Sequence, residues 1–428
     1  MQYLLKHLHL VDPLEKIDTL ADILITNGII EKVGTRISGN KNIKEIDFKD
    51  CFAGPGFIDM HVHFREPGYE YKETVETGIH SAANGGFTAV CPMPNTNPTV
   101  DNEALVRWLI DQSRQIHDGI VDLYPIAAVT KGREGRELAP MLELAEAGAV
   151  GFSDDGSPVE NAEVLRRALE YAKMTSRLII QHAEDLNLSK GGVMNEGFVS
   201  TSLGMKPIPA ASEESVIARD LKLVEYLMAP YHIAHISTSG SVDLVRNAKL
   251  KKLPVTCEIT PHHFTLSDDI VRSFDTNTKM NPPLRSKDDL EALKEGLKDG
   301  TIDVIASDHA PHSFDEKQVE FIFAPFGIVG LETAIGLALT ELFHKKILTI
   351  QQIIEKFSIN PRKILNLPKI KIAEGEKANI TIFNPDTEWI VDLEKFKSKS
   401  KNSPFHGKKL KGKPVAVFNN NQLVVSDL

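Results

Sequence analysis

His61 and His63 lie two residues apart, at the end of an apolar segment that follows Gly54-Pro55-Gly56. Side chains at positions i and i+2 of a β-strand project from the same face, so both imidazoles can reach one cation if this segment is a strand. Neutral histidine is the commonest metal ligand in proteins. An isolated pair of this kind is a weak signal, but its place at the end of an apolar strand favours a metal site over two unrelated histidines.

Two aspartates follow another apolar segment, which ends at Ser153. Along a strand, Asp155 shares a face with Ser153 and Gly151, whose small side chains suit a crowded interior, whereas Asp154 shares the other face with Phe152. We therefore expect Asp155 to point inward, where it can bind a cation. Asp154 is predicted to cap a turn.

Two further histidines and one aspartate end later apolar segments of the chain. His182 or His235 alone would more often be a buried structural histidine, but together they indicate a second pair of ligands. His232, three residues before His235, should face the other side of its strand and is predicted to be structural. Asp308 suits a general base beside a metal-bound water, although a lone aspartate at such a place more often caps a turn.

The candidate ligands offer four imidazole nitrogens and two carboxylates to a metal, and they are His61, His63, Asp155, His182, His235 and Asp308. Such a set suits zinc, as one ion or as two ions a few ångströms apart, although sites without thiolates also accept other divalent metals. A bound metal lowers the pKa of water from about 15.7 towards about 7 and supplies hydroxide at neutral pH. We therefore expect hydrolysis or its reverse, with hydroxide as the nucleophile and Asp308 as general acid and base.

Eight short apolar segments alternate with helix-like stretches and supply the strand ends that these residues need. The segments are residues 56–62, 88–91, 123–129, 149–153, 178–182, 232–236, 255–259 and 303–307. This order predicts an α/β fold, a (β/α)8 TIM-like barrel, whose active site would lie at the C-terminal ends of the strands. A doubly wound open sheet is the alternative, but no Gly-x-Gly-x-x-Gly motif follows the first strand.

The two ends of the chain differ from this middle region. Both are rich in short β-branched segments separated by turns such as Thr26-Asn27-Gly28, and they predict one small β-sandwich domain formed by both termini. The predicted division is 1–53 and 368–428 for that domain and 54–367 for the barrel. Residues 395–411, rich in Lys, Ser and Gly, are predicted to form a solvated loop, and residues 314–326 to form a mobile lid.

The composition argues against several classes of protein. The chain has 428 residues with 49 basic and 59 acidic side chains, a net charge of -10 that disfavours a nucleic-acid binder. Its three distant cysteines form neither a disulfide framework nor a CxxC zinc motif, which indicates a reducing, cytoplasmic compartment. We find no signal-peptide pattern and no apolar run of about 18 residues, so no membrane association is expected.

Longer motifs carry a resemblance to a known family. The run from Gly54 to Arg65 and the run Asp308-His309-Ala310-Pro311-His312 resemble the amidohydrolase superfamily and, within it, the long type I dihydroorotases. The likeness covers essentially the whole chain, since Met93-Pro94-Asn95-Thr96, Phe152-Ser153-Asp154-Asp155-Gly156, Asn281-Pro282-Pro283-Leu284-Arg285 and the β-rich ends also match. Together these motifs are far more specific than any one of them.

The resemblance implies a distorted barrel with a composite β-sandwich and a centre of one or two zinc ions. Asp155 would bridge two ions, and Asp308 would be both a ligand and the general base. The other ligands would divide into pairs, His61 and His63 on one ion and His182 and His235 on the second. A homodimer and an association with aspartate transcarbamoylase are further expectations.

The resemblance also implies the substrate, because type I dihydroorotases reversibly close N-carbamoyl-L-aspartate to dihydroorotate in pyrimidine synthesis. Arg65, Asn95 and His312 match positions that bind the substrate carboxylate, and Asn281 matches one that contacts the pyrimidine ring. A guanidinium can bind a carboxylate through two hydrogen bonds. Arg65 would share the face of His63 if the strand continues that far.

Two alternatives stay open at this point. Hydantoinases and allantoinases of the same superfamily bridge two metals with a carboxylated lysine at the end of strand four, whereas no lysine occurs here from residue 132 to 170 and Asp155 stands in that place. This difference favours a dihydroorotase over another cyclic amidohydrolase. An inactive homologue that supports aspartate transcarbamoylase is the second alternative, and the complete ligand set argues against it.

Overall fold

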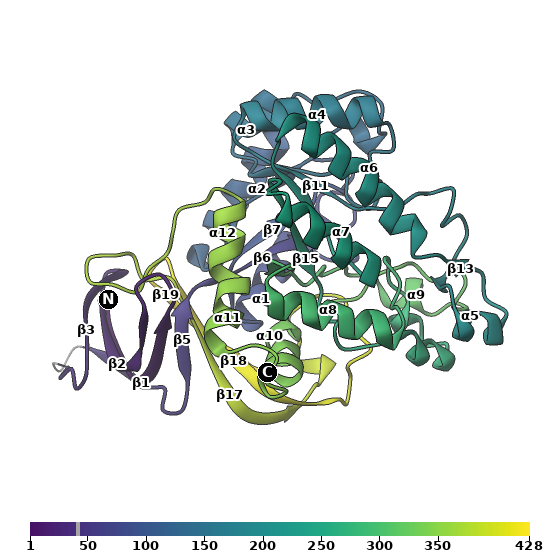
Figure 1. The fold of residues 1–428 in the computed structure, drawn as a ribbon. Coiled ribbons are helices and arrows are strands. Elements are labelled where there is room, and N and C mark those ends of the chain that lie inside the picture. Colours follow the sequence, from purple (N-terminus) through teal and green to yellow (C-terminus); the bar gives the residue numbers. More distant parts are fainter. Residues whose placement is uncertain (40–42) are drawn as a thin grey trace.

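The computed structural model describes residues 1–39 and 43–428, and its barrel contains the eight predicted strands in chain order (Figure 1). The strands are β6 (Phe57–Val62), β7 (Phe87–Pro92), β8 (Asp122–Leu123) with β9 (Ile126–Ala127), β10 (Gly151–Phe152), β11 (Ile179–Gln181), β14 (Tyr231–Ile233), β15 (Val255–Ile259) and β16 (Val304–Ile305). Neighbouring strands pair in parallel. β8 and β9 are halves of one barrel strand. The N–H of Tyr124 donates to a carbonyl of β7, and the carbonyl of Pro125 accepts the N–H of the residue just before β10.

The first and last strands close the barrel through a side chain as well as the backbone. The buried carboxylate of Asp59, in β6, accepts the backbone N–H of Ser307 just after β16, at 3.0 and 3.1 Å. Just beyond the C-terminal ends of these two strands, the N–H of His63 donates to the carbonyl of His309 at 2.8 Å. The predicted (β/α)8 barrel is therefore confirmed, and the open-sheet alternative is wrong.

Helices surround these strands and complete the barrel. The longer ones are α1 (Val75–Asn84), α2 (Glu103–Gln115), α3 (Met141–Ala147), α4 (Ala162–Met174), α6 (Ala211–Leu227), α7 (Ser239–Leu250) and α8 (Lys287–Asp299). The shorter ones are α5 (Phe198–Leu203), α9 (Phe314–Lys317), α10 (Ala334–Ala338), α11 (Ile350–Ile354) and α12 (Asn360–Ile364), and β12 (Met194–Asn195) pairs with β13 (Pro207–Ile208). Within the described part of the chain, no helix is both long and apolar enough to span a membrane.

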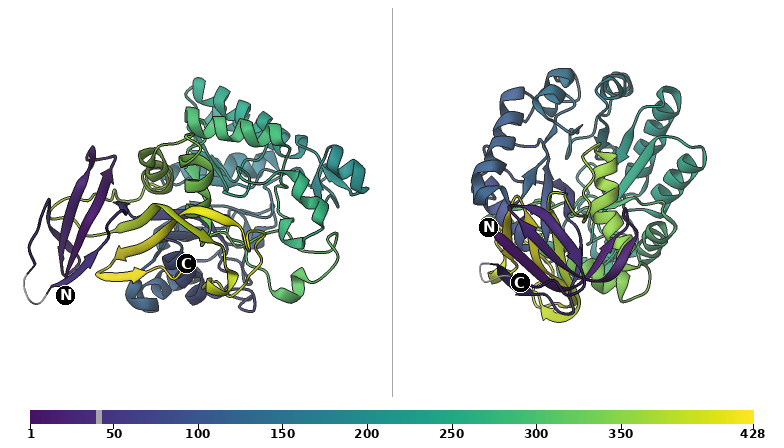
Figure 2. Two further views of the ribbon diagram at one scale, coloured as in Figure 1. Left: turned by 90° about the horizontal axis from the view of Figure 1, so that it is seen from below. Right: turned by 90° about the vertical axis from the view of Figure 1, so that its left-hand side faces the viewer.

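The two ends of the chain form one β-sheet beside the barrel (Figure 2). Its strands are β1 (Gln2–Asp12), β2 (Ile17–Thr26), β3 (Ile29–Gly34), β4 (Lys44–Asp47), β5 (Phe52–Pro55), β17 (Ile380–Ile390), β18 (Lys409–Asn419) and β19 (Gln422–Val425). β5 pairs with β17 and so joins the termini. Apolar side chains from both ends, such as Leu5, Ile23, Ile380 and Phe418, share one core. The predicted β-domain formed by both termini is confirmed, whereas its residue boundaries stay a prediction.

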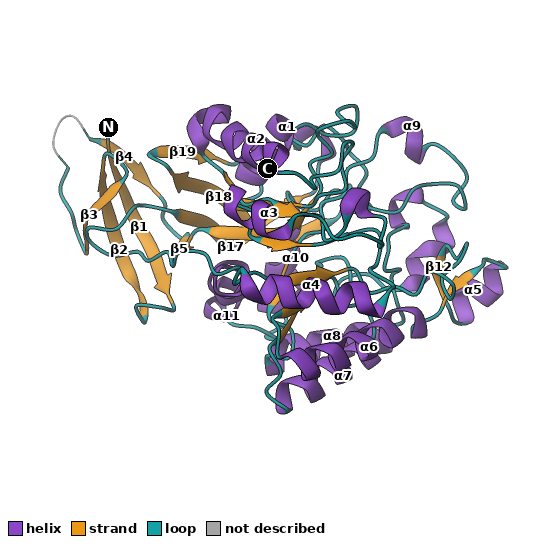
Figure 3. Ribbon diagram, turned by 90° about the horizontal axis from the view of Figure 1, so that it is seen from above, coloured by secondary structure: helices purple, strands orange, loops and turns teal. Residues whose placement is uncertain are grey.

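Residues 395–411 do not form the solvated loop that their composition predicted. In this stretch Phe396, Ser398, Ser400 and Asn402 are buried, and the lysines between them are exposed or half-buried. Small polar side chains are therefore buried against the loops of the barrel, while the lysines stay closer to the surface. Figure 3 shows the sheet of the two termini at one end of the molecule and the helices around the barrel. The segment contacts two loops of the barrel, at Glu73 and Ala310.

The segment predicted to be a lid packs against the barrel through two lysines. Lys279 donates to the carbonyls of Phe321 and Ile322, both at 2.9 Å. Lys317 donates to the carbonyls of Thr276 and Pro325, at 3.1 and 2.7 Å. The segment covers the rim of the barrel in this conformation, and its mobility stays a prediction.

Candidate metal centre

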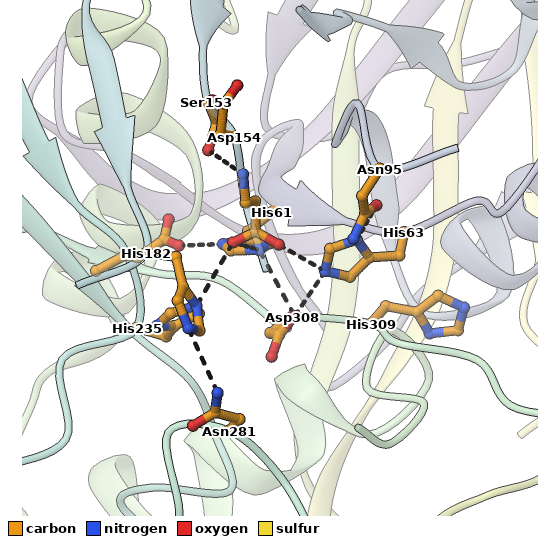
Figure 4. A network of polar contacts seen from close by, with 12 residues as sticks. His61, His63, Asn95, Ser153, Asp154, His182, His235, Asn281, Asp308 and His309 are labelled. Atoms are coloured by element: carbon orange, nitrogen blue, oxygen red, sulfur yellow. Dashed lines mark hydrogen bonds and ion pairs between the residues drawn. The ribbon is translucent and has the colours of Figure 1, made fainter. Parts of the chain in front are cut away.

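The six predicted metal ligands converge at the C-terminal end of the barrel. Figure 4 labels all of them except Asp155. They are His61 in β6, His63 next to it, Asp155 beyond β10, His182 after β11, His235 beyond β14 and Asp308 beyond β16. All of them are more than nine-tenths buried. Parallel barrel strands bring residues that are far apart in sequence together at this end, which is why strand position predicted the cluster.

The first histidine pair faces both aspartates. Nε2 of His63 lies 3.0 Å from Oδ1 of Asp308 and 3.4 Å from Oδ2 of Asp155. Nε2 of His61 lies 3.3 Å from Oδ1 of Asp155 and 3.6 Å from Oδ1 of Asp308. Two nitrogens and two carboxylates thus surround one small, buried volume.

These residues fit a divalent metal ion. Two sets of ligand atoms each lie within 4.8 Å of one another, one from His61, His63 and Asp308 and one from His61, Asp155 and His235. Three buried atoms of these residues have no hydrogen-bond partner among the described residues, namely Nε2 of His61, Oδ1 of Asp155 and Nδ1 of His235. An unsatisfied buried polar atom costs about 1–3 kcal/mol, which a cation bound to these atoms would offset. Nitrogen and oxygen donors without thiolate suit zinc and other divalent ions.

Side chains outside the centre orient the first pair. Nδ1 of His61 donates to Oε1 of Glu258 at 2.6 Å, and Nδ1 of His63 donates to Oδ1 of Asn95 at 2.8 Å. Because Nδ1 carries the proton in each ring, Nε2 of a neutral ring keeps a lone pair directed at the centre. When either ring is neutral, it is therefore held in the tautomer that can bind a metal through Nε2.

The histidines keep both central carboxylates ionised. Burial alone would raise the pKa of Asp308, but the hydrogen bond from His63 and the charge of His61 lower it. Burial likewise opposes ionisation of Asp155, and His61 and His235 again lower the pKa well below the usual range. Both groups are therefore ionised carboxylates at neutral pH, which is the form that binds a metal.

The second histidine pair is arranged differently. Nε2 of His182 donates to Oε2 of Glu184 at 3.0 Å, and Nδ1 of His182 lies 3.0 Å from Nε2 of His235, so the two rings share a hydrogen bond. Oδ1 of Asp155 is 3.9 Å from Nδ1 of His182 and 3.7 Å from Nε2 of His235. The ring nitrogens nearest to Asp155 are thus engaged with each other.

Two carboxylates behind the histidines were not identified from the sequence. Glu258 lies in β15 and is fully buried between His61 and His232, whose Nε2 is 3.2 Å from Oε2. His232 also bonds Thr256 and does not face the centre, in line with its predicted structural role. The sequence feature that could have identified Glu184 is its spacing of two residues from His182. For Glu258 the corresponding feature is a single glutamate inside an apolar strand.

Arg65 and His312 lie together at the rim, but not for the predicted reason. β6 ends at Val62 and Arg65 has a left-handed φ of 63°, so the expected continuation of the strand is wrong. Nε of Arg65 donates to the carbonyl of Pro311 at 3.1 Å, next to His312. Nε2 of His312 donates to the carbonyl of Phe326 at 2.8 Å. Burial and the nearby charge of Arg65 lower the pKa of His312 to about 2.

The two predicted substrate-binding asparagines contact ligand histidines. Oδ1 of Asn95 accepts from His63, which leaves its amide nitrogen for another partner. Nδ2 of Asn281 donates to Oε2 of Glu184 at 2.9 Å and lies 3.4 Å from Nε2 of His182. Both side chains thus border the centre, one beside each histidine pair.

Asp154 has the structural role that the sequence predicts. Its Oδ1 accepts the backbone N–H groups of Val129 and Thr130 at 2.8 and 3.0 Å, and Oδ2 accepts the hydroxyl of Thr130. The carboxylate therefore fixes the loop after β9. Asp155, its neighbour in sequence, is the residue that reaches the centre.

Comparisons with known proteins agree with this architecture. The family model described as "Dihydro-orotase-like" matches residues 52–241. A dihydroorotase of Pelobacter propionicus is 49% identical over 98% of this chain and 98% of its own length, and a dihydroorotase of Acetivibrio thermocellus is 50% identical over 99% of both chains.

Solved structures with the same fold include proteins named as a hydantoinase and a dihydropyrimidinase. L-Hydantoinase (dihydropyrimidinase) from Arthrobacter aurescens is 25% identical, with a TM-score of 0.86 over 99% of this chain and 96% of that one. Dihydropyrimidinase from Brevibacillus agri is 20% identical, with a TM-score of 0.83 over 100% and 95% of the two chains. The second likeness concerns the fold alone.

Proposed function

The chain belongs to the dihydroorotase family, and on that premise we propose that it catalyses the reversible cyclisation of N-carbamoyl-L-aspartate to dihydroorotate in pyrimidine synthesis. The position of Arg65 is the observation that best supports this substrate. Its guanidinium lies at the rim of the buried centre with only Nε engaged among the described residues, so both Nη groups can bind a carboxylate. Dihydroorotate carries such a carboxylate, and hydantoin does not.

The ligands found together would hold the metal: His61, His63, Asp155, His182, His235 and Asp308. When bound, the metal supplies hydroxide at neutral pH and polarises the amide carbonyl. Asp308 takes the proton of the attacking water and delivers it to the ring nitrogen that leaves during hydrolysis. Cyclisation runs through the same proton transfers in reverse.

The rim residues orient the substrate by its carboxylate. Arg65 supplies charge, and the amide nitrogen of Asn95 supplies a neutral donor. His312 already donates from Nε2 to Phe326, so it can donate to an anion only when Nδ1 is protonated as well. Asn281, on the opposite side of the centre, would contact the ring of the substrate.

We further propose zinc as the ion, since nitrogen and carboxylate ligands without thiolate suit it. Cys51, Cys91 and Cys257 are all free and buried, which supports the proposed reducing, cytoplasmic compartment. A homodimer and an association with aspartate transcarbamoylase stay predictions.

The test is turnover of three cyclic amides by one metal-loaded preparation whose metal content is measured. We expect hydrolysis of dihydroorotate and little hydrolysis of hydantoin or allantoin. Asp308→Asn should lower kcat for dihydroorotate by about 10²- to 10⁴-fold. Turnover of hydantoin or allantoin without dihydroorotate would overturn the proposed substrate. An unchanged kcat in Asp308→Asn, at equal metal content, would overturn the assigned base.

A further inference from the structure

We propose that residues 396–405, the C-terminal strap, hold in place the loop after β16 that carries Asp308 and His312, and that Asn402 is a positioning residue for substrate binding. The strap lies between β17 and β18, so it belongs to the sequence of the terminal β-domain rather than to the barrel. The inference rests on the proposed roles of Asp308 and His312. It adds a residue outside the barrel to the machinery that binds the substrate.

The side chain of Asn402 joins two loops at the rim. Its Oδ1 accepts the backbone N–H of His312 at 3.0 Å, and its Nδ2 donates to the carbonyls of Ala310 and Gly327 at 3.1 and 3.0 Å. Its own carbonyl accepts the N–H of Val329 at 3.0 Å. One buried amide thus makes three side-chain bonds, all to backbone groups of the loop after β16 and the loop that faces it.

Those two loops carry the contacts on which His312 depends. The carbonyl of Phe326, which accepts from Nε2 of His312, immediately precedes Gly327. The loops also pair directly, since the N–H of Ala310 donates to the carbonyl of Ile328 at 2.7 Å. A change at Asn402 therefore acts on both the backbone and the ring partner of His312.

A second group of strap contacts ends beside the general base. The hydroxyl of Ser398 and the N–H of Lys399, the latter at 3.0 Å, donate to the buried carboxylate of Glu73. Oε2 of Glu73 is 3.3 Å from Nε2 of His309, the residue after Asp308. Nδ1 of His309 accepts the N–H of Gly330 at 3.1 Å, which fixes its ring from the other side. The strap thus reaches the loop of Asp308 and His312 at two points.

The chemistry of the amide explains why asparagine is needed. Aspartate at position 402 would keep an acceptor for His312 but would turn a carboxylate oxygen towards the carbonyls of Ala310 and Gly327. Two acceptors facing each other repel, so the loops would move apart. A displacement of about 1 Å at a substrate-positioning residue can cost about a hundredfold in activity.

The experiment compares three variants of the full-length, metal-loaded protein, which are Asn402→Asp, the milder Asn402→Ser and Asn379→Asp as a matched control. Asn379 is also buried, but its side chain bonds Asn419 in the terminal β-domain at 3.0 Å. KM and kcat for dihydroorotate, metal content and stability are measured for each. We expect both Asn402 variants to raise KM by about ten- to a hundredfold at normal metal content, with kcat changed much less.

The control separates positioning from folding. Asn379→Asp should lower stability and leave KM unchanged. If a folded Asn402 variant keeps the KM of the unsubstituted protein, or if Asn379→Asp raises KM equally, the inference is wrong. If the unsubstituted protein does not turn over dihydroorotate, the proposed function has failed, and that result is distinct from an active protein with insensitive Asn402 variants.

Discussion

Both histidine pairs at the centre face Asp155, but they are held in different ways. His61 and His63 are anchored from behind, through Nδ1, by Glu258 and Asn95. This leaves both Nε2 atoms directed at the centre. In the second pair, His182 and His235 are hydrogen-bonded to each other at 3.0 Å (Figure 4).

The difference shows which ligands are ready for a metal and which must rearrange. His61 belongs to both sets of close ligand atoms, and His182 belongs to neither. An ion that binds both His182 and His235 has to displace the proton that the two rings share, because only an unprotonated nitrogen coordinates a metal. We infer that the first pair forms the tighter part of the centre.

The sharpest test of this comparison removes one histidine from each pair. His61→Ala should lose bound metal and dihydroorotate turnover together, because it removes a ligand from both sets. His182→Ala should retain an ion and lose less activity. Metal per chain by elemental analysis and kcat on the same preparation measure both effects.

His406→Ala is a suitable control, since His406 is exposed and lies outside the centre. It should behave like the unsubstituted protein. Equal loss of metal in His61→Ala and His182→Ala would show that the two pairs contribute alike and would contradict the comparison.

The second test concerns the carboxylates behind the rings. Glu258→Gln keeps the shape of the side chain but removes the negative charge that makes His61 a better ligand, and such partners typically contribute about 10- to 100-fold in metal affinity or activity. Glu184→Gln makes the same change behind His182 and should have a smaller effect. Competition with a metal chelator gives both affinities, and a larger loss in Glu184→Gln would reverse the order of the pairs.

The cluster of candidate ligands was predictable from the sequence because each of them lies at or just after the end of an apolar strand. In a parallel barrel, strand ends meet on one face whatever lies between them in sequence, so the pattern alone places His182 near His61. The alternation rule also selected Asp155 over Asp154, although β10 itself ends at Phe152. These two rules need no knowledge of packing, and the predicted barrel and cluster depend on little else.

Other parts of the site depend on packing that a local pattern does not contain. Glu258 bonds His61 from 197 residues away, and nothing beside it in sequence names that partner. The position of Arg65 follows from a left-handed turn after Val62 rather than from the strand. For residues 395–411 composition was misleading, because alternate burial of small polar side chains, as at Ser398, matters more than the number of lysines.

The adjacent aspartates give the smallest and most specific test, because they separate a ligand from a structural carboxylate at one place in the chain. Asp154→Ala leaves the buried N–H groups of Val129 and Thr130 without their acceptor, which should lower the free energy of unfolding by about 1–3 kcal/mol.

Asp154 points away from the centre, so metal content in Asp154→Ala should stay unchanged. Asp155→Ala should lose metal, because it removes a carboxylate from one of the two sets of close ligand atoms. Denaturant unfolding and elemental analysis measure the two quantities. Loss of metal from Asp154→Ala would mean that the loop after β9 supports the centre as directly as the ligands do. The proposed difference between the structural Asp154 and the ligand Asp155 would then be wrong.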